Sequence, residues 1–353
     1  MDIKLFDFAL PPERIALRPV SPRDAAKMLV AGPEGEFADR TVADLPQILQ
    51  RNDCLIFNDT RVIPAQLTGT RSGPGAGATI GATLHKRIDL RRWQAFIKNA
   101  KRLRVGDEID FCNNVRAAAE ARHADGSFTL AFLGAEPVEL LLERAGKMPL
   151  PPYIASKRGI DARDREDYQT MFAEKDGAVA APTASLHFTP DLIAAVDAAG
   201  IQRETLTLHV GAGTFLPVKA DDTDDHVMHS EWGCITADMA DRLNDVRARG
   251  GRLIAVGTTV LRLMESAARA DGTIGAFEGD TDIFITPGYR FKAVGGLMTN
   301  FHLPKSTLFM LVSALMGREQ MLHTYKHAIE HEYRFYSYGD SSLLLPGGTK
   351  EPS

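Results

Sequence analysis

The stretch from residue 65 to residue 148 differs in pattern from the chain on either side of it. Short runs of alternating apolar and polar residues are separated by turn signals, among them residues 72–75 and the pair Asp125-Gly126. The alternation is clearest at Phe128, Leu130 and Phe132. Short strands at regular spacing are typical of a barrel or sandwich, and the Asp-Gly pair predicts a hairpin turn whose two central residues both take positive φ. We therefore expect a small antiparallel β-barrel domain at 65–148.

The flanking residues, 1–64 and 149–353, have the pattern of an α/β domain. Leu253–Val256 is an apolar run that predicts a strand, and Gly257 introduces a helical pattern with one apolar face. Residues 282–288 repeat the strand-to-turn pattern. A chain of 353 residues exceeds what one hydrophobic core usually supports. The predicted fold is an α/β main domain, discontinuous in sequence, with the β-barrel inserted into it.

Composition excludes several classes of protein. The chain is 44% apolar and 25% charged, as ordinary folded globular proteins are. Its cysteines, Cys54, Cys112 and Cys234, form no Cys-x-x-Cys pair, so we expect neither a disulfide framework nor a structural zinc site. No apolar run reaches ~18 residues, and the first residues lack an apolar segment of signal-peptide length. We expect a cytoplasmic protein without membrane contact.

A strand pattern formed by Leu206, Leu208 and Val210 leads into a loop that contains two glycines, Gly211 and Gly213. His209 lies at the junction of strand and loop. Glycine has no Cβ, so its backbone can approach a ligand closely. Taken alone, the pattern is more often a strand that ends in a tight turn, so a functional interpretation depends on the other segments.

Polar residues at the ends of strands supply further candidates. Asp59 and Arg61 follow the apolar run 54–57. Their side chains either point into a site at the end of the strand or belong to an Asx-type turn by which the chain leaves the sheet. Thr258 opens the helix after Gly257, and the unpaired amides of a first helical turn suit an anionic group. That motif is weak alone, because most such turns bind nothing.

Two more groups of polar residues lie next to predicted helices. His187 comes just before a helix that Thr189 is expected to cap. Thr299, Asn300 and His302 precede a strongly apolar helix predicted at 308–316. Polar loop residues ahead of a buried helix are typical of a site, although capping alone also explains hydroxyls at such a helix start.

The run from His226 to Glu231 most resembles a metal site. We predict no metal, because the His-Glu-x-x-His pattern and a ready fourth ligand are both lacking. On a strand, His229 and Glu231 would share one face while His226 pointed away. A buried His-Glu pair could orient a general base, since the carboxylate sets the imidazole tautomer. The alternative is a polar surface strand.

A basic run lies inside the predicted barrel. Between His85 and Arg104, eight lysines and arginines accompany a single acid, Asp89. If the two halves of this run lie on neighbouring strands, they form a patch able to contact phosphates; a solvated barrel rim is the alternative. The net charge of −5 argues against a protein that coats nucleic acid through the electrostatic field of the whole molecule.

Other nucleotide-binding and hydrolase motifs are missing from the sequence. The glycine loop lacks a third glycine at the dinucleotide spacing, where Leu216 stands, and no Gly-Lys-Ser/Thr follows it. The common methyltransferase fold would require an acidic residue and a fuller glycine run there. No Gly-x-Ser-x-Gly elbow of a serine hydrolase is present.

Four stretches together resemble the S-adenosylmethionine:tRNA ribosyltransferase-isomerase family of queuosine biosynthesis. They are NDTRVIPA (58–65), APTASLHFT (181–189), HVGAGTF (209–215) with HVMHSE (226–231), and MTNFHLP (298–304). The likeness covers essentially the whole chain. The sequence departs from the family at Ser185, where glycine is usual, at Gln66 and Leu216, where arginine is common, and at Ser341-Ser342. These departures affect only contacts at those positions.

The resemblance implies transfer of the ribosyl moiety of S-adenosylmethionine to 7-aminomethyl-7-deazaguanine at the wobble position of tRNA. Rearrangement would give epoxyqueuosine and release adenine and methionine. S-adenosylmethionine would be consumed as a cosubstrate, with no bound prosthetic group. The wobble nucleotide lies in a single-stranded loop, so a protein can read it without opening a duplex. We expect tRNA as partner and a monomeric protein.

The resemblance also implies roles for residues. A sulfonium acidifies the protons on the adjacent C5′, so His209 or His229 would act as the base, with Glu231 as its orienting partner. Gly211 and Gly213 would approach the substrate closely. The other implied substrate-binding residues are Asp59, Arg61, Thr183, His187, Thr214, Thr258, Thr299, Asn300 and His302. Those implied for tRNA are Lys98, Lys101, Arg102 and Arg104.

Two other classes of function stay open. One is a nucleoside-binding or glycosyl-transfer enzyme that acts on a free small molecule, and the other is a non-catalytic RNA-binding module. The histidine and glycine segments argue against the RNA-binding module, and the basic barrel argues mildly against the free-molecule enzyme.

Overall fold

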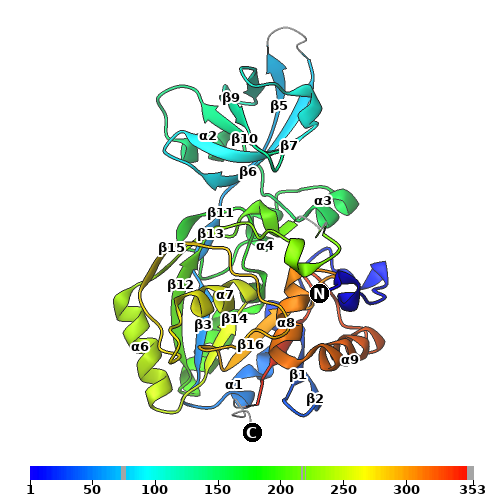
Figure 1. The fold of residues 1–353 in the computed structure, drawn as a ribbon, viewed down its shortest axis with the longest axis vertical. Helices are drawn as coiled ribbons and strands as arrows, with labels where there is room; N and C mark the ends of the chain where they lie inside the picture. The colour runs from blue at the N-terminus through cyan, green and yellow to red at the C-terminus, as the bar shows by residue number, and fades with distance from the viewer. Residues whose placement is uncertain (73–76, 216–217, 219, 348–353) are drawn as a thin grey trace.

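The computed structural model describes residues 1–72, 77–215, 218 and 220–347, and it has two lobes joined by a narrow waist (Figure 1). The small lobe is a β-barrel and the large lobe is an α/β domain, which confirms the predicted fold class. The turn expected at 72–75 falls largely, and Leu216 entirely, outside the described residues.

Six antiparallel strands close the barrel in the order β10-β7-β6-β5-β8-β9. The elements of this lobe are β5 (Gln66–Ser72), β6 (Thr79–Arg87), β7 (Arg92–Lys98), β8 (Glu108–Phe111), β9 (Arg116–Arg122), β10 (Phe128–Phe132) and α2 (Val138–Ala145). Alternate residues such as Leu67, Leu84 and Leu130 point inward and form the lobe's core. The predicted hairpin joins β9 to β10. Of its two central residues only Gly126 has positive φ, because the Asp125 carboxylate accepts the Ser127 N–H and closes the turn differently.

The main sheet has the strand order β15-β13-β12-β3-β14-β16-β17-β1-β2. Its strands are β1 (Lys27–Ala31), β2 (Phe37–Thr41), β3 (Cys54–Asn58), β12 (Gln202–Leu208), β13 (Glu231–Ile235), β14 (Leu253–Val256), β15 (Phe277–Thr281), β16 (Gly296–Asn300) and β17 (Ser341–Leu344). The central strands β12, β3, β14 and β16 pair in parallel. Their carboxyl ends therefore meet at one edge of the sheet, where ligands of such sheets usually bind.

Helices cover both faces of this sheet. They are α1 (Leu45–Ile48), α5 (Pro190–Ala198), α6 (Ala237–Ala248), α7 (Thr258–Ala267), α8 (Thr307–Met316) and α9 (Arg318–Glu330). Side chains of β3 alternate between two cores: Cys54 and Ile56 pack with α6 to α9, and Leu55 and Phe57 pack with α1 and α5. None of the helices in the described ranges combines the length and apolar character that crossing a membrane requires.

Smaller elements connect these layers. Strands β4 (Thr60–Val62) and β11 (Lys175–Ala178) form a separate parallel pair, and α3 (Pro152–Arg158) and α4 (Asp164–Asp167) follow the barrel. Single 3₁₀ turns occupy η1 (Ile3–Phe6), η2 (Pro12–Arg14), η3 (Arg23–Ala25), η4 (Val42–Asp44), η5 (Ala100–Arg102), η6 (Thr183–His187), η7 (Ala212–Phe215) and η8 (Thr223–Asp225).

The prediction of a strand at 282–288 is wrong. The strand lies earlier, at β15, where it pairs antiparallel with β13 at the edge of the sheet. Because an edge strand is partly solvated, β15 has a polar sequence that does not stand out. The apolar Ile283, Phe284 and Ile285 instead pack against the core from a loop.

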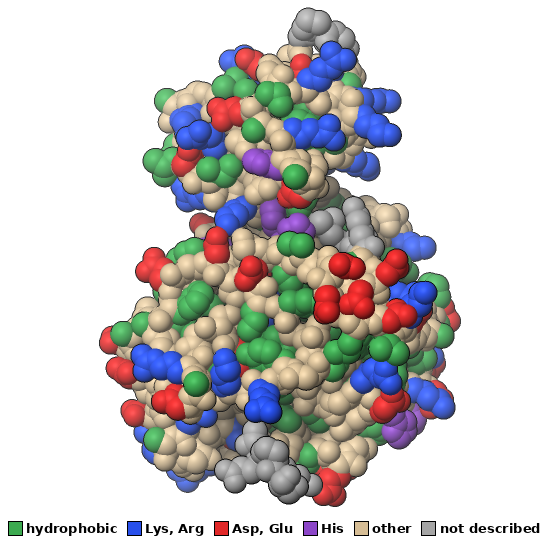
Figure 2. All heavy atoms as spheres, in the orientation of Figure 1, with side chains coloured by type: hydrophobic (Ala, Val, Ile, Leu, Met, Phe, Trp, Pro, Cys, Tyr) green, Lys and Arg blue, Asp and Glu red, His purple; other side chains and the backbone are tan. Residues whose placement is uncertain are grey.

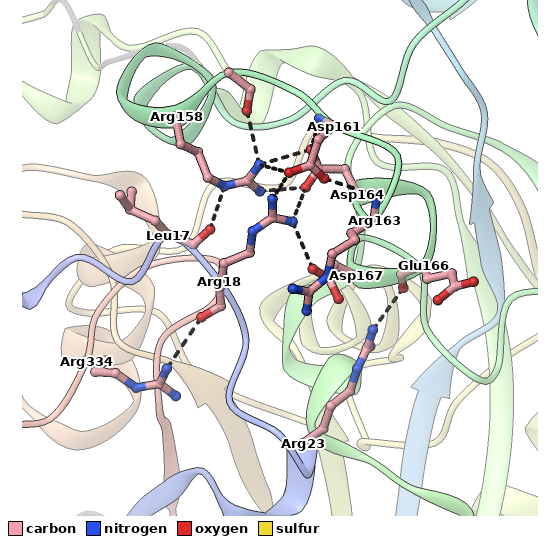
Figure 3. A network of polar contacts seen from close by, with 11 residues as sticks. Leu17, Arg18, Arg23, Arg158, Asp161, Arg163, Asp164, Glu166, Asp167 and Arg334 are labelled. Atoms are coloured by element: carbon pink, nitrogen blue, oxygen red, sulfur yellow. Dashed lines mark hydrogen bonds and ion pairs between the residues drawn. The ribbon is translucent and has the colours of Figure 1, made fainter.

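An ion-pair network anchors the chain where it returns from the barrel (Figure 3). The buried Asp164 carboxylate accepts hydrogen bonds from Arg18 of the N-terminal segment at 2.9 Å and from Arg158 at 2.5 Å. Burial opposes ionisation of Asp164, but the hydrogen bonds from Arg158 and the Asp161 N–H, together with the charges of Arg158 and Arg18, outweigh it and lower the pKa of Asp164. Asp161 also pairs with Arg18, and Arg334 donates to the Arg18 carbonyl. Three separate parts of the chain are thus joined beside the base of the barrel.

Candidate active site

Two adjoining cavities open at the carboxyl ends of the central strands. The larger, of about 410 Å³, lies within the main domain, and the smaller, of about 320 Å³, also reaches the barrel through Phe96 and Asp125. They share a wall formed by Val210, Thr214, Val218, Thr258, Thr259, Thr307 and Leu308. We call the two together the cleft. It lies toward the waist of the molecule, where Figure 2 shows histidine side chains between the lobes.

Six predicted substrate-binding residues line the larger cavity: Thr214 and Thr258 in the shared wall, and Thr183, Thr299, Asn300 and His302 elsewhere. Asn300 ends β16, and its side chain is held on both sides. Its Oδ1 accepts from the Thr183 hydroxyl at 3.1 Å, and its Nδ2 donates to the Tyr336 carbonyl at 3.2 Å. The amide therefore has a set orientation at the cavity wall.

Two buried histidines support this wall in neutral form. Burial lowers the pKa of His302 to about 3, and the His302 Nε2 lies 3.2 Å from the Thr299 hydroxyl. Burial likewise lowers the pKa of His187 to about 4. His187 does not line either cavity of the cleft; its Nε2 lies 3.4 Å behind the Asn300 amide. Both imidazoles can bond and orient, but neither carries a charge at neutral pH.

The two glycines of the loop make room for histidine rings. A Cβ on Gly211 would lie 2.9 Å from the His85 ring, and one on Gly213 would lie 2.5 Å from the His229 ring. His85 belongs to β6 of the barrel, and its ring meets that of His229 edge to face, with 5.3 Å between centroids. We expected the backbone of these glycines to lie close to the substrate. In the structure, their backbone lies close to the His85 and His229 imidazoles.

Glu231 does not have the partner that the sequence predicts. His229 precedes β13 rather than lying on it, so the two side chains do not share a strand face. Within the described chain, the buried Glu231 carboxylate accepts from the Gly211 N–H at 2.9 Å and pairs with Arg262 at 2.6 Å. The predicted His-Glu pair is therefore wrong. Glu231 instead ties the glycine loop to α7.

His209 points away from the cleft. Val210 lines both cavities, and because neighbouring residues at a strand end face opposite sides, His209 lies on the other side. There its ring stacks on Trp232, with 5.2 Å between centroids, and its Nδ1 lies 2.8 Å from the Thr60 hydroxyl. Burial lowers the pKa of His209.

Asp59 and Arg61 lie on that same far side and line neither cavity. The Asp59 carboxylate accepts from the Thr207 hydroxyl at 2.7 Å, and burial raises the pKa of Asp59. Arg61 donates to the Ala173 carbonyl and pairs with Asp176. The structure therefore divides the predicted residues: His229, Glu231, Gly213, Thr214, Thr258 and the larger-cavity residues meet, whereas Asp59, Arg61 and His209 do not join them.

The basic run separates into two halves with different contacts. Its first half lies mainly on β6 and is paired: Lys86 contacts Asp280 of the main domain at 2.6 Å, and Arg87 pairs with Glu139. The second half follows β7 and is exposed, and its side chains form no ion pair with any residue in the described ranges; it consists of Lys98, Lys101, Arg102 and Arg104. The register of β6 and β7 sets Lys86 opposite Gln94 near the hairpin turn and Lys98 opposite Gly81 at the far end of the strands, so the two halves do not form one patch. The exposed second half stays a predicted tRNA-binding surface.

Comparison with known proteins identifies the family of this chain. A family model described as "Queuosine biosynthesis protein" matches residues 3–344. Similar relatives named S-adenosylmethionine:tRNA ribosyltransferase-isomerase come from Sphingopyxis alaskensis, with 74% identity over 98% of this chain and 97% of the relative, and from Zymomonas mobilis, with 62% identity over 98% and 100%. The chain belongs to the queuosine biosynthesis protein family.

A solved structure similar to this chain has the same overall fold. The S-adenosylmethionine tRNA ribosyltransferase of Thermotoga maritima is 31% identical, covers 97% of this chain and 100% of its own, and gives a TM-score of 0.56. The family inferred from four short stretches is thereby confirmed.

Four residues at or beside the cleft of this queuosine biosynthesis protein were missed by sequence reasoning: His85, Phe96, Asp125 and Arg262. The first three come from the barrel, whose sequence indicated only a tRNA-binding surface. Arg262 lies one helical turn after Thr258, so the spacing of four residues could have placed it on the same face of α7. In the described ranges, no group of His, Cys, Asp or Glu is placed to hold a metal.

Proposed function

We propose that this chain transfers the ribosyl moiety of S-adenosylmethionine to 7-aminomethyl-7-deazaguanine at the wobble position of tRNA and isomerises it to epoxyqueuosine. Adenine and methionine leave. S-adenosylmethionine is consumed as a cosubstrate. Family membership supports this reaction, and the cleft supports it physically, because two adjoining cavities of this size suit a small molecule with a nucleoside part and an amino-acid part.

His229 is the base in this proposal. It lines the smaller cavity next to Gly213, whereas His209 lies outside the cleft. The sulfonium of S-adenosylmethionine makes the C5′ protons acidic, and an imidazole at the cleft can accept one of them. Asn300, with its amide held by Thr183 and Tyr336, offers hydrogen bonds to the polar edge of the nucleoside in the larger cavity.

The tRNA contacts the exposed barrel patch of Lys98, Lys101, Arg102 and Arg104. Figure 2 shows basic side chains over much of the barrel lobe, which suits a phosphate backbone. From there, an unstacked wobble base has to reach the smaller cavity, where Phe96 of the barrel offers an aromatic face. The cytoplasmic location and the monomeric state stay predictions from the sequence.

The deciding experiment measures adenine release from S-adenosylmethionine with and without tRNA that carries 7-aminomethyl-7-deazaguanine. Release that depends on this tRNA is the expected result. Release without tRNA would favour an enzyme that acts on a free small molecule, and tRNA binding without any release would favour a non-catalytic RNA-binding module. Either of these results would contradict the proposed function.

A further inference from the structure

The amino end of α7 opens into the cleft without a side-chain cap. Gly257 occupies the cap position with φ of 102°, so no cap hydroxyl or carboxylate bonds the first turn. The first amides of a helix have no intrahelical acceptor and attract anions. Thr258 is only 7% exposed, and Thr258 and Thr259 line both cavities. This helix start alone would not make a site.

Arg262, one turn further along α7, provides an independent observation. It is 6% exposed and lines the smaller cavity. Its Nη1 donates to Glu231 at 2.6 Å and its Nε donates to the Ile283 carbonyl at 3.1 Å. Its Nη2 is buried and has no hydrogen-bond partner in the described part of the chain. A buried donor without an acceptor is costly, and an acceptor that binds there removes that cost.

The contacts of Arg262 fix the direction of its free donor. Two of the three guanidinium nitrogens are held by Glu231 and Ile283, so the planar group cannot turn without breaking both bonds. Glu231 is itself held by the Gly211 N–H. The guanidinium of Arg262, a residue of the smaller cavity's wall, is therefore held in one orientation before any ligand arrives, which lowers the entropy cost of binding.

We propose that Arg262 and the first turn of α7 bind the carboxylate of the amino-acid part of S-adenosylmethionine. This inference rests on the proposed function and names the subsite within it. The amino-acid part occupies the smaller cavity, the nucleoside occupies the larger one, and the sulfonium lies near the shared wall at Val210 and Thr214. His229 is then on the same side as the C5′ position.

A tRNA phosphate is the other anion that could reach this site. The smaller cavity also presents the carboxylates of Asp125 and Asp225. These carboxylates repel a polyanionic backbone, but they suit the ammonium group that an amino acid carries beside its carboxylate. The charge arrangement therefore favours a zwitterion over a phosphate.

The test compares binding of S-adenosylmethionine with binding of decarboxylated S-adenosylmethionine, which keeps the nucleoside and sulfonium. Calorimetry in the presence of tRNA with guanine at the wobble position measures affinity without turnover. Wild-type protein should prefer S-adenosylmethionine by about 10-fold or more, because a charge-assisted hydrogen bond is lost in the analogue. In Arg262→Lys, which keeps the positive charge toward Glu231, the preference should fall to within about 2-fold.

Matched variants keep the test decisive. Arg242→Gln on α6 removes an exposed arginine that pairs with Glu204, and it should leave the preference unchanged. Thr258→Pro removes one N–H of the first turn at a helix position that tolerates proline, and it should reduce the preference even if Arg262→Lys does not fold. Equal wild-type affinity for the two ligands, or an unchanged preference in the folded variants, would overturn the subsite.

Weaker tRNA binding with an unchanged preference would assign the site to a phosphate instead. Failure of tRNA-dependent adenine release would overturn the reaction, whereas the binding preference tests the subsite separately.

Discussion

The imidazole of His85 on the barrel meets the imidazole of His229 on the main domain edge to face, with ring centroids 5.3 Å apart. The Phe96 ring of the barrel lies against both imidazoles. Its centroid is 4.8 Å from that of the His85 ring and 5.9 Å from that of the His229 ring. Burial, and then the nearby charge of His229, lowers the pKa of His85 to about 4, so His85 stays neutral at pH 7. The barrel therefore forms part of the wall around the proposed base and does more than carry the basic patch.

Replacement of His229 should affect catalysis far more than replacement of His209. His229→Ala is expected to lower the rate of tRNA-dependent adenine release by about 100-fold or more, the usual scale for loss of a general base. His209→Ala should lower it by less than about 10-fold, because that ring contacts Trp232 and Thr60 outside the cleft. Single-turnover assays on folded variants measure both rates. Equal losses in the two variants would contradict the assignment of His229.

A methyl group at either loop glycine should displace a histidine. Gly211→Ala and Gly213→Ala are each expected to lower kcat by at least about 10-fold and stability by about 1–3 kcal/mol through overpacking against His85 and His229. Gly275→Ala is the control, since its Cβ would meet its nearest atom at an ordinary 3.5 Å. Urea denaturation and adenine release report the two effects. Full activity in both loop variants would show that the rings can move without consequence.

Neutralising the exposed patch should weaken tRNA binding in a salt-dependent way. The variant changes four residues to glutamine: Lys98, Lys101, Arg102 and Arg104. A plot of the logarithm of the tRNA association constant against the logarithm of the salt concentration has a negative slope. That slope should become shallower by up to about 0.7 for each phosphate that the variant no longer neutralises. Filter binding at several salt concentrations measures the slope. Arg203→Gln with Arg242→Gln removes two paired arginines of the main domain and should leave the slope as it is. An unchanged slope in the patch variant would make those residues a solvated rim.

Acidification below pH 6.5 should destabilise the fold through its buried histidines. Burial lowers the pKa of His187 to about 4 and that of His302 to about 3, whereas an unfolded histidine has a pKa of about 6.5. Between these values the unfolded chain binds more protons than the native one, so the free energy of unfolding falls as pH falls. The contribution is about 1.4 kcal/mol per pH unit for each histidine. Urea denaturation from pH 7 to pH 5 checks this, and His187→Gln should reduce the slope by about one histidine's share. A flat profile would contradict the neutral state of these side chains.

Local patterns in the sequence were enough to predict much of the fold. Alternation and turn residues located the barrel, an apolar run located β14, and the expected cap Thr189 located the start of α5, where the Thr189 hydroxyl accepts the Leu192 N–H. These features depend on neighbours within a few residues, so they can be recognised along the chain. The edge strand β15 was misplaced because its polar sequence lacks such a pattern.

The sequence by itself also determined the family, since long ordered motifs carry it, and it named several of the polar residues that line the larger cavity. Only the tertiary structure decided which side chains meet. It turned His209 away from the cleft, paired Glu231 with Arg262 instead of a histidine, and set His85 of the barrel against Gly211. The physical reason is that a one-residue step at a strand end reverses the direction of a side chain, and contacts between the barrel and the main domain join positions far apart in the chain. Neither the direction of a side chain at a strand end nor a contact between the two lobes can be predicted from a local sequence pattern.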